Sequence, residues 1–189
     1  IEVIVANGFD KNALQILKKK KNLRIIDSSN FLFNQNLKSN SINNSILVQS
    51  EDKNIFSEKD FKVVSKRKPN KSQFKDLIFA FNVCRYVKSN AIVLASNKST
   101  IGIGSGQPSR LDSCNIAINK MNKFAKDKSE IVAASDAFFP FVDGIEKLVQ
   151  SGVTAVIQPS GSIRDKEIIN FANSTETILI FSKTRHFRH

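Results

Sequence analysis

Residues 131–160 read IVAASDAFFPFVDGIEKLVQSGVTAVIQPS, and this stretch decides the fold class. The apolar run 131–134 predicts a buried strand, the apolar spacing within 145–149 predicts a helix, and 153–157 predicts a second strand. Short apolar strands that alternate with helices favour a parallel sheet with helices on both faces.

The same alternation runs from Pro69 to residue 181. The expected elements are a helix over 74–84, a hairpin of strands 91–95 and 100–104, a helix over 111–125, the unit quoted above, a helix around 168–172 and a strand over 177–181. This order predicts an α/β fold with three α-β-α layers and a mostly parallel mixed sheet that begins with a hairpin.

A different composition precedes Pro69. Residues 1–6 predict a strand, Asp10 is placed to cap a helix, and 23–27 predict a second strand. The segment that follows is rich in Asn, Ser and Lys, and we expect it to be a connector with isolated strands at 46–48 and 61–65. We therefore predict two domains, 1–65 and 66–189. Because the chain opens directly on a strand without an initiator methionine, we expect it to be a piece of a larger protein.

The composition is that of a globular protein, with 41% hydrophobic and 24% charged residues among 189. The sequence has neither an apolar run of spanning length nor a signal-peptide pattern, so we expect a cytoplasmic protein. Cys84 and Cys114 each fall in a helical pattern, which favours reduced core thiols.

The formal net charge is +12, with lysines clustered at 18–21 and basic residues around 66–71. Such clusters occur in nucleic-acid-binding proteins, so a basic RNA-binding module without enzymatic activity is the alternative function. Solvated surface charge is the stronger explanation of the lysines, because no aromatic residues alternate with them.

Three turns follow predicted strands, at the sheet edge where ligands of such folds gather. GIGSGQPSR (102–110) combines close-approach glycines with a helix start, although glycine can also simply turn the chain. QPSGSIRDKE (158–167) places Ser162 and Asp165 at capping-box spacing, and capping alone explains the pattern. SDAFFPFVDG (135–144) crowds three phenylalanines, which form either a stacking surface or an apolar plug.

The last residues, TRHFRH (184–189), carry both histidines of the chain. A solvated end or the remnant of a tag is one interpretation. The other is an ordered tail, because the segment follows the last strand without a linker and contains Phe187 as an apolar anchor.

These turns resemble a known family. KSNAIVLA (88–95), GIGSGQPSRLDS (102–113), SDAFFPFVDG, GVTAVIQPSGSIRDKE (152–167) and RHFRH (185–189) are similar, in register, to the C-terminal part of the bifunctional purine biosynthesis family that combines AICAR transformylase with IMP cyclohydrolase. The resemblance implies formyl transfer from the co-substrate 10-formyltetrahydrofolate to the 5-amino group of AICAR. It also implies a homodimer, and a second cytidine-deaminase-like subdomain over 66–189 preceded by the end of a first.

The resemblance also implies site residues. The family's AICAR contacts fall on Asn90, Arg110, Phe138 and Arg185, of which Asn90 is also expected to act in catalysis. Its folate contacts fall on Leu111, Asp143, Ser162 and Ile163. Asp136 and His189 match positions near a monovalent cation in some members, and the resemblance implies potassium as this cation.

Three departures limit the resemblance. Pro108 and Val142 replace residues that are usual in the family, and NNSILVQSED (43–52) replaces a glycine-rich segment. The family's adjacent Lys-His pair, which performs acid-base chemistry, has no counterpart here. We therefore expect the chain alone to be inactive. The His/Cys zinc signature of true deaminases is absent as well, so we expect no metal cofactor of that kind.

Overall fold

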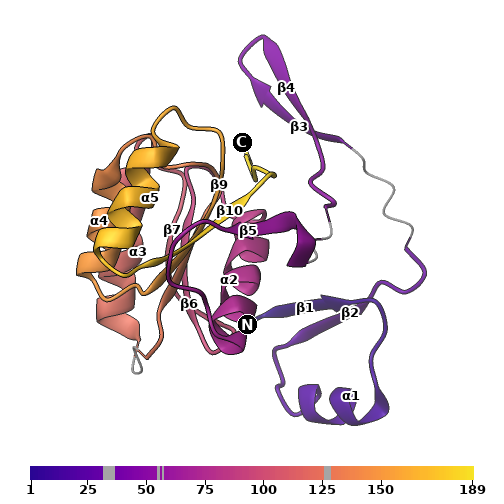
Figure 1. Ribbon diagram of the computed structural model, residues 1–189. Helices are drawn as coiled ribbons and strands as arrows, with labels where there is room; N and C mark the ends of the chain where they lie inside the picture. Colours follow the sequence, from indigo (N-terminus) through magenta and orange to yellow (C-terminus); the bar gives the residue numbers. More distant parts are fainter. Residues whose placement is uncertain (32–36, 55, 57, 126–128) are drawn as a thin grey trace. The chain divides into compact units, whose positions relative to one another are not determined.

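The computed structural model describes residues 1–31, 37–54, 56, 58–125 and 129–189, and these form two compact units, Ile1–Glu51 and Asp52–His189 (Figure 1). The first unit opens with β1 (Val3–Ala6), α1 (Lys11–Leu17) and β2 (Arg24–Asp27). The two strands pair in parallel, which confirms the predicted strand-helix-strand unit. Asp10 is the N-cap of α1, although its side chain makes no capping hydrogen bond.

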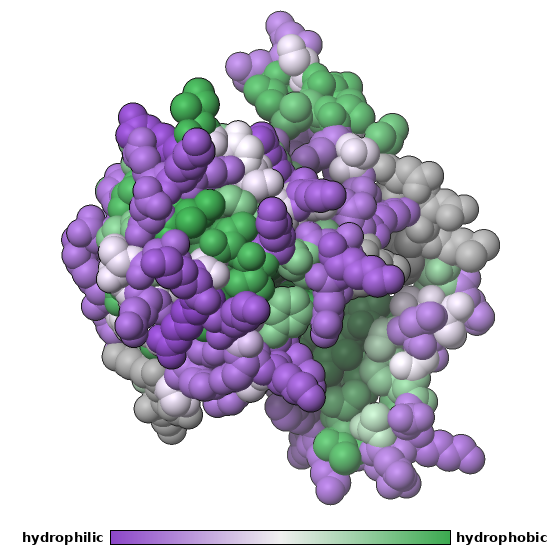
Figure 2. Space-filling model, viewed as in Figure 1, coloured by the Kyte–Doolittle hydropathy of each residue, from purple (hydrophilic) through white to green (hydrophobic). Residues whose placement is uncertain are grey.

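The rest of the first unit is a hairpin that the sequence predicted only in part. β3 (Leu37–Ile42) and β4 (Ser45–Ser50) pair antiparallel around a two-residue turn, with Asn43 at a φ of 50°. The strand predicted at 46–48 is therefore real but not isolated. Its partner was missed because LKSNSI is too polar to give a strand signal. In Figure 2 apolar side chains gather on this hairpin, where Leu37 and Ile46 are more than half exposed.

The second unit is built on a six-stranded sheet in the order β5-β10-β9-β8-β6-β7. Its strands are β5 (Phe61–Val63), β6 (Ile92–Ser96), β7 (Ser99–Gly104), β8 (Val132–Ser135), β9 (Ala155–Pro159) and β10 (Ile178–Ser182). The centre, β8-β9-β10, is parallel. β6 runs antiparallel to β8 and forms the predicted hairpin with β7, and β5 lies antiparallel along β10.

Four helices cover the two faces of this sheet, which confirms the three-layer α-β-α prediction (Figure 1). They are α2 (Lys71–Cys84), α3 (Arg110–Phe124), α4 (Val142–Gln150) and α5 (Asp165–Ser174), and a short 3-10 helix (Glu58–Asp60) precedes β5. α2 packs on one face, and α3, α4 and α5 pack on the other. The central strands are apolar on both sides: in β6, Ile92 faces the α3 layer and Val93 faces α2. This two-sided burial produces the continuous apolar runs in the sequence.

The segment before α2 belongs to the second unit. In β5, Val63 pairs with Ile180 of β10, and the hydroxyl of Ser65 accepts a hydrogen bond from the backbone N–H of Leu179 at 2.8 Å. The boundary between the two units therefore falls in the sequence between Glu51 and Asp52, whereas a boundary after residue 65 was predicted. Among the described residues, no helix combines the length and apolar character needed to cross a bilayer.

Both cysteines are free and buried, as predicted. Burial raises the pKa of Cys84 well above its usual range and that of Cys114 to about 12. Neither thiol therefore has the thiolate character of a reactive cysteine.

The hairpin of β6 and β7 fits against α3 because two of its residues are glycines. A Cβ at Gly104 would collide with the carbonyl oxygen of Ser113, and one at Gly102 would collide with that of Ala117. Both obstacles are helix backbone, which cannot rotate away.

We expect Gly104→Ala to lower the free energy of unfolding of the second unit by about 2–3 kcal/mol, because β7 or α3 must shift. Urea unfolding followed by near-UV circular dichroism measures the loss. Gly106→Ala is the control: its Cβ would make only ordinary van der Waals contact with the Lys88 side chain, but the residue has a φ of 68°, so only a backbone cost of about 1 kcal/mol is expected. Equal losses at both positions would contradict the packing argument.

Candidate functional site

The sheet brings the predicted ligand turns to one edge. β8, β9 and β10 are parallel, so the segments that follow them all leave the sheet at this edge. β6 is antiparallel to both neighbours, with Ile92 opposite Ser135 of β8 and Gly104 of β7. The start of β6 and the end of β7 therefore reach the same edge, where ligands of open α/β sheets bind.

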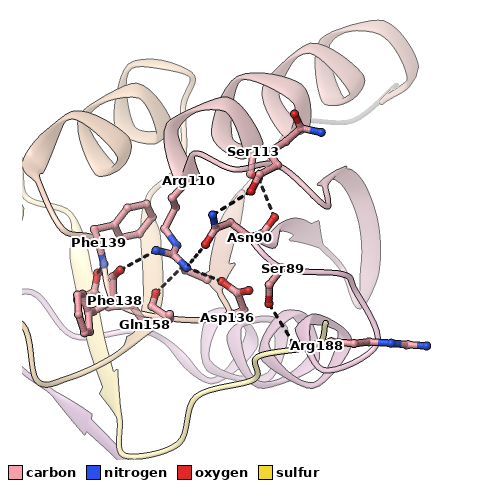
Figure 3. A network of polar contacts seen from close by, with 12 residues as sticks. Ser89, Asn90, Arg110, Ser113, Asp136, Phe138, Phe139, Gln158 and Arg188 are labelled. Atoms are coloured by element: carbon pink, nitrogen blue, oxygen red, sulfur yellow. Dashed lines mark hydrogen bonds and ion pairs between the residues drawn. The ribbon is translucent and has the colours of Figure 1, made fainter. Parts of the chain in front are cut away.

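Arg110 is at the centre of this edge (Figure 3). It lies in the first turn of α3, which Ser109 caps by accepting a hydrogen bond from the backbone of Asp112. The Arg110 guanidinium donates through Nη2 to Asp136 Oδ1 at 2.9 Å and to Asn90 Oδ1 at 2.8 Å. It also donates through Nη1 to the carbonyl oxygen of Phe138 at 3.1 Å. Three of the four predicted AICAR residues therefore share one network.

Both polar atoms of the Asn90 side-chain amide form hydrogen bonds within the protein. Its Nδ2 donates to the carbonyl oxygens of Gln107 and Pro108, both at 2.9 Å, while its Oδ1 accepts from Arg110. Its own carbonyl oxygen accepts from the hydroxyl of Ser113 at 2.8 Å. Both amide hydrogens are used by the protein, so only the remaining lone pair of Oδ1 is available to a ligand.

The three phenylalanines of 138–141 have three different environments. Phe138 is half-buried, and the guanidinium of Arg185 lies 4.9 Å from its ring centroid. Phe139 is buried in the core, where its ring leaves no room for a side chain at Gly144. Phe141 is 52% exposed beneath Arg164. Phe139 is therefore the predicted apolar plug. Phe138 contacts Arg110 through its carbonyl oxygen and Arg185 through its ring, and its stacking on a ligand stays a prediction.

The tail is ordered and returns to this edge. The backbone N–H of His186 donates to the carbonyl oxygen of Asp136 at 2.8 Å, and Arg188 and Ser89 exchange two hydrogen bonds. The imidazole of His186 is buried between Phe56 and Phe81, and its Nδ1 contacts the carboxylate of Asp52. These contacts fix the backbone on the C-terminal side of Arg185.

The predicted folate residues occupy the starts of three helices at this edge. Leu111 lies in the first turn of α3, and Asp143 lies in the first turn of α4 with its carboxylate accepting from Gly144 N–H at 2.7 Å. Ile163 is fully exposed. Ser162 is not the cap of α5: the helix begins at Asp165 with Arg164 as N-cap, and the Ser162 hydroxyl accepts from the backbone of Arg164 instead.

Only one of the two hydrogen bonds of the capping box predicted for α5 forms, the one that the Asp165 side chain accepts. The carboxylate of Asp165 accepts hydrogen bonds from the backbone N–H groups of Gly161 and Ser162. These return bonds shape the loop, and Ser162 as a residue is half-buried.

The two residues assigned to a cation lie in different surroundings. Asp136 is buried against Arg110, whereas His189 is exposed with its ring stacked on Phe187 at 5.8 Å. Within the described ranges, no cluster of three or more His, Cys, Asp and Glu side chains is arranged to hold a metal ion. The monovalent cation stays a prediction from the resemblance.

Several buried polar atoms at this edge have no hydrogen-bond partner among the residues that the structure describes. They are Arg110 Nε, Asp136 Oδ2, Gln158 Nε2 and His186 Nε2. Unsatisfied atoms of this kind mark places where water or a ligand completes the bonding. Sequence reasoning missed Gln158, whose Oε1 accepts from Phe139 N–H at 3.3 Å. The available signal was a polar residue inside an otherwise apolar strand.

Comparisons with known proteins identify the family of the chain. The protein family described as "AICARFT/IMPCHase bienzyme" matches residues 1–120 of the chain. The chain belongs to this family. Relatives named "Bifunctional purine biosynthesis protein PurH" include those of Aquifex aeolicus (strain VF5), 44% identical, and Buchnera aphidicola subsp. Baizongia pistaciae (strain Bp), 45% identical. All of this chain aligns with each, but it spans only 37% and 36% of their lengths.

A solved structure also aligns with the chain. The apo dCMP deaminase from the cyanophage S-TIM5 matches 59% of this chain and 98% of its own, with 14% identity and a TM-score of 0.40.

His186 makes the stability of this family member depend on pH. Burial lowers the pKa of His186 below its ordinary value of 6.5, and Asp52 only partly offsets this. The unfolded chain therefore binds this proton more readily, and folding stability falls as the pH drops below about 6.5.

We expect His186→Leu, which keeps an apolar group between Phe56 and Phe81, to flatten the pH dependence of the melting temperature between pH 7 and 5. His189→Leu, at the exposed end of the tail, is the matched control and leaves the slope in place. An unchanged slope in His186→Leu would show that other groups set the acid sensitivity.

Proposed function

We propose that this chain is the C-terminal part of an AICAR transformylase, which acts in purine biosynthesis. In this proposal 10-formyltetrahydrofolate donates a formyl group to the 5-amino group of AICAR within a bifunctional protein that also has IMP cyclohydrolase activity. The observation that carries the proposal is the single cluster of Asn90, Arg110, Phe138 and Arg185. These residues come from four separate segments, and the sheet brings them to one edge.

The reaction needs groups of the kind found at this edge. The amine of AICAR is a weak nucleophile because its lone pair delocalises into the imidazole carboxamide. An enzyme must therefore hold amine and formyl carbon in contact, remove a proton and stabilise the tetrahedral oxyanion. Fixed guanidinium donors suit the carboxamide and phosphate oxygens of AICAR.

Two arginines and Phe138 have binding roles that follow from their surroundings. Arg110 is already oriented by three protein acceptors, and it retains donor hydrogens for a ligand. Arg185 is exposed, so its guanidinium is free to bind an anionic group while it rests on Phe138. Phe138 offers a flat apolar surface beside both arginines, which suits a planar heterocycle.

The folate would lie beside this cluster. Leu111, Asp143, Ser162 and Ile163 are at helix starts along the same edge, and Asp143 is an exposed carboxylate suited to the amino groups of a pterin. Ile163 is the most exposed large apolar side chain of this edge, and a bound folate would cover it.

The pair of residues that would transfer protons in this reaction does not occur in this chain. The 189 residues contain no Lys-His dipeptide, and in this proposal that pair comes from a different part of the protein. The proposed homodimer belongs to the same complete protein. We accordingly infer that this chain contributes ligand binding and not turnover.

The binding role predicts that AICAR stabilises the full-length protein and that Arg185→Ala and Phe138→Leu each weaken its affinity at least 10-fold. Isothermal titration calorimetry measures the affinity. Arg185 and Phe138 are suited to this test because neither is a buried charge, so folding is preserved. Arg67→Ala is the control, since Arg67 contacts the backbone of Glu176 at the opposite end of β10.

The alternative of an RNA-binding module gives a different result. It predicts RNA affinity that falls steeply with salt, without saturable binding of AICAR. No AICAR binding by the full-length protein would refute the proposed function.

The missing acid-base pair predicts that the 189-residue chain has no formyltransferase activity, whereas the full-length protein is active. A spectrophotometric assay of tetrahydrofolate release measures both under the same conditions. Mixing the isolated chain with the remainder of the protein is the control, and partial recovery of activity is expected. Appreciable turnover by the isolated chain would contradict the inference that it contributes ligand binding without catalysis.

A further inference from the structure

We propose that Asp136 is a positioning residue that holds Arg110 and the tail carrying Arg185 in their binding arrangement before the ligand arrives. The inference rests on the proposed function, because it takes the two arginines as AICAR contacts. The resemblance assigned Asp136 only to the neighbourhood of a cation, so this role comes from the contacts of the folded chain.

The side chain of Asp136 acts on Arg110. Its carboxylate is 0% exposed, and the side chain of Arg110 is only 11% exposed. A carboxylate enclosed in this way requires a charged partner, and Arg110 Nη2 supplies it at 2.9 Å. Because Asn90 Oδ1 and the carbonyl oxygen of Phe138 accept from the same guanidinium, its plane is fixed by three acceptors.

The backbone of Asp136 acts on the tail. Its N–H donates to the carbonyl oxygen of Ala91 at 3.2 Å, which ties the residue to the start of β6. Its carbonyl oxygen accepts from the N–H of His186 at 2.8 Å. His186 follows Arg185 directly, and Phe138, on which Arg185 rests, is two residues after Asp136. One residue therefore sets the positions of both arginines.

The arrangement has a clear advantage for binding. A free arginine side chain has many rotamers, and a ligand that must order it loses affinity. An arginine already fixed by buried acceptors presents its remaining hydrogens in one orientation. Arg110 Nε and Asp136 Oδ2 are buried without a partner among the described residues, so the network is not closed on itself.

A purely structural role is the competing explanation, in which the ion pair only fastens α3 to the end of β8. Asp76 provides a reference for such a role. It is a buried aspartate, 3% exposed, whose carboxylate accepts from the backbone N–H groups of Asn97 and Lys98 at the turn between β6 and β7. This turn is at the opposite edge of the sheet from Arg110.

The test compares Asp136→Asn with Asp76→Asn in the full-length protein. Asparagine keeps the shape and one acceptor oxygen, but it removes the charge that holds the guanidinium. We expect Asp136→Asn to raise the dissociation constant for AICAR, measured by calorimetry, about 10- to 100-fold. A folate analogue should bind as before, and Asp76→Asn should lower the melting temperature without changing either dissociation constant.

The outcomes separate the inference from the function on which it rests. If the unmodified protein does not bind AICAR, the proposed function fails. If it does, and Asp136→Asn binds AICAR as tightly as the unmodified protein, Asp136 has no positioning role. Equal weakening of AICAR and folate binding would also overturn the inference, because it would indicate general damage to the edge.

A measurement on the unmodified protein covers the case in which Asp136→Asn does not fold. Guanidinium NMR signals, with Arg110 assigned through Arg110→Lys, report whether the side chain is ordered without ligand. Positioning predicts a resolved Arg110 signal in the free protein that persists when AICAR is added. A signal averaged in the free protein and resolved only with AICAR would overturn the proposal.

Discussion

Asp136 directly follows the buried strand β8, and its carboxylate is wholly enclosed, which is costly for a charged group unless it has a charged or hydrogen-bonding partner. Arg110 is that partner, and the direction of its side chain toward Asp136 constrains the neighbouring segments at this edge. The first turn of α3 has to lie beside the end of β8, and Asn90 has to present its amide oxygen to the same guanidinium. The ion pair is therefore a constraint on three segments of the chain and not a local surface contact.

The sheet order makes this constraint possible. A parallel β8-β9-β10 centre brings three following segments to one edge, and the reversed direction of β6 adds its own beginning and the end of β7. Residues as distant in sequence as Asn90 and Arg185 can therefore belong to one cluster. The backbone glycines of β7 contribute by allowing α3 to approach closely enough for Arg110 to reach the strand ends.

Much of this fold was predictable because its elements are periodic. The helix over 74–84 and the apolar strands were found from spacing, since each buries a regular face. β3 was missed because its mostly polar sequence, LKSNSI, has no buried face to reveal it. The resemblance predicted a site at Arg110 and Phe138, whereas the pairing of Arg110 with Asp136 joins residues 26 positions apart and leaves no local pattern. The burial of Phe139 was unpredictable for the same reason, because it depends on the space left at Gly144.

The last residues of the chain have a practical consequence. Arg188 is bound through its backbone to Ser89, which precedes Asn90, so the tail ends beside the residues that gather around Arg110. A purification tag, fluorescent reporter or immobilisation linker joined after His189 would emerge at this edge and crowd it. Protein engineering of this chain should therefore attach such groups elsewhere, for example within an exposed loop.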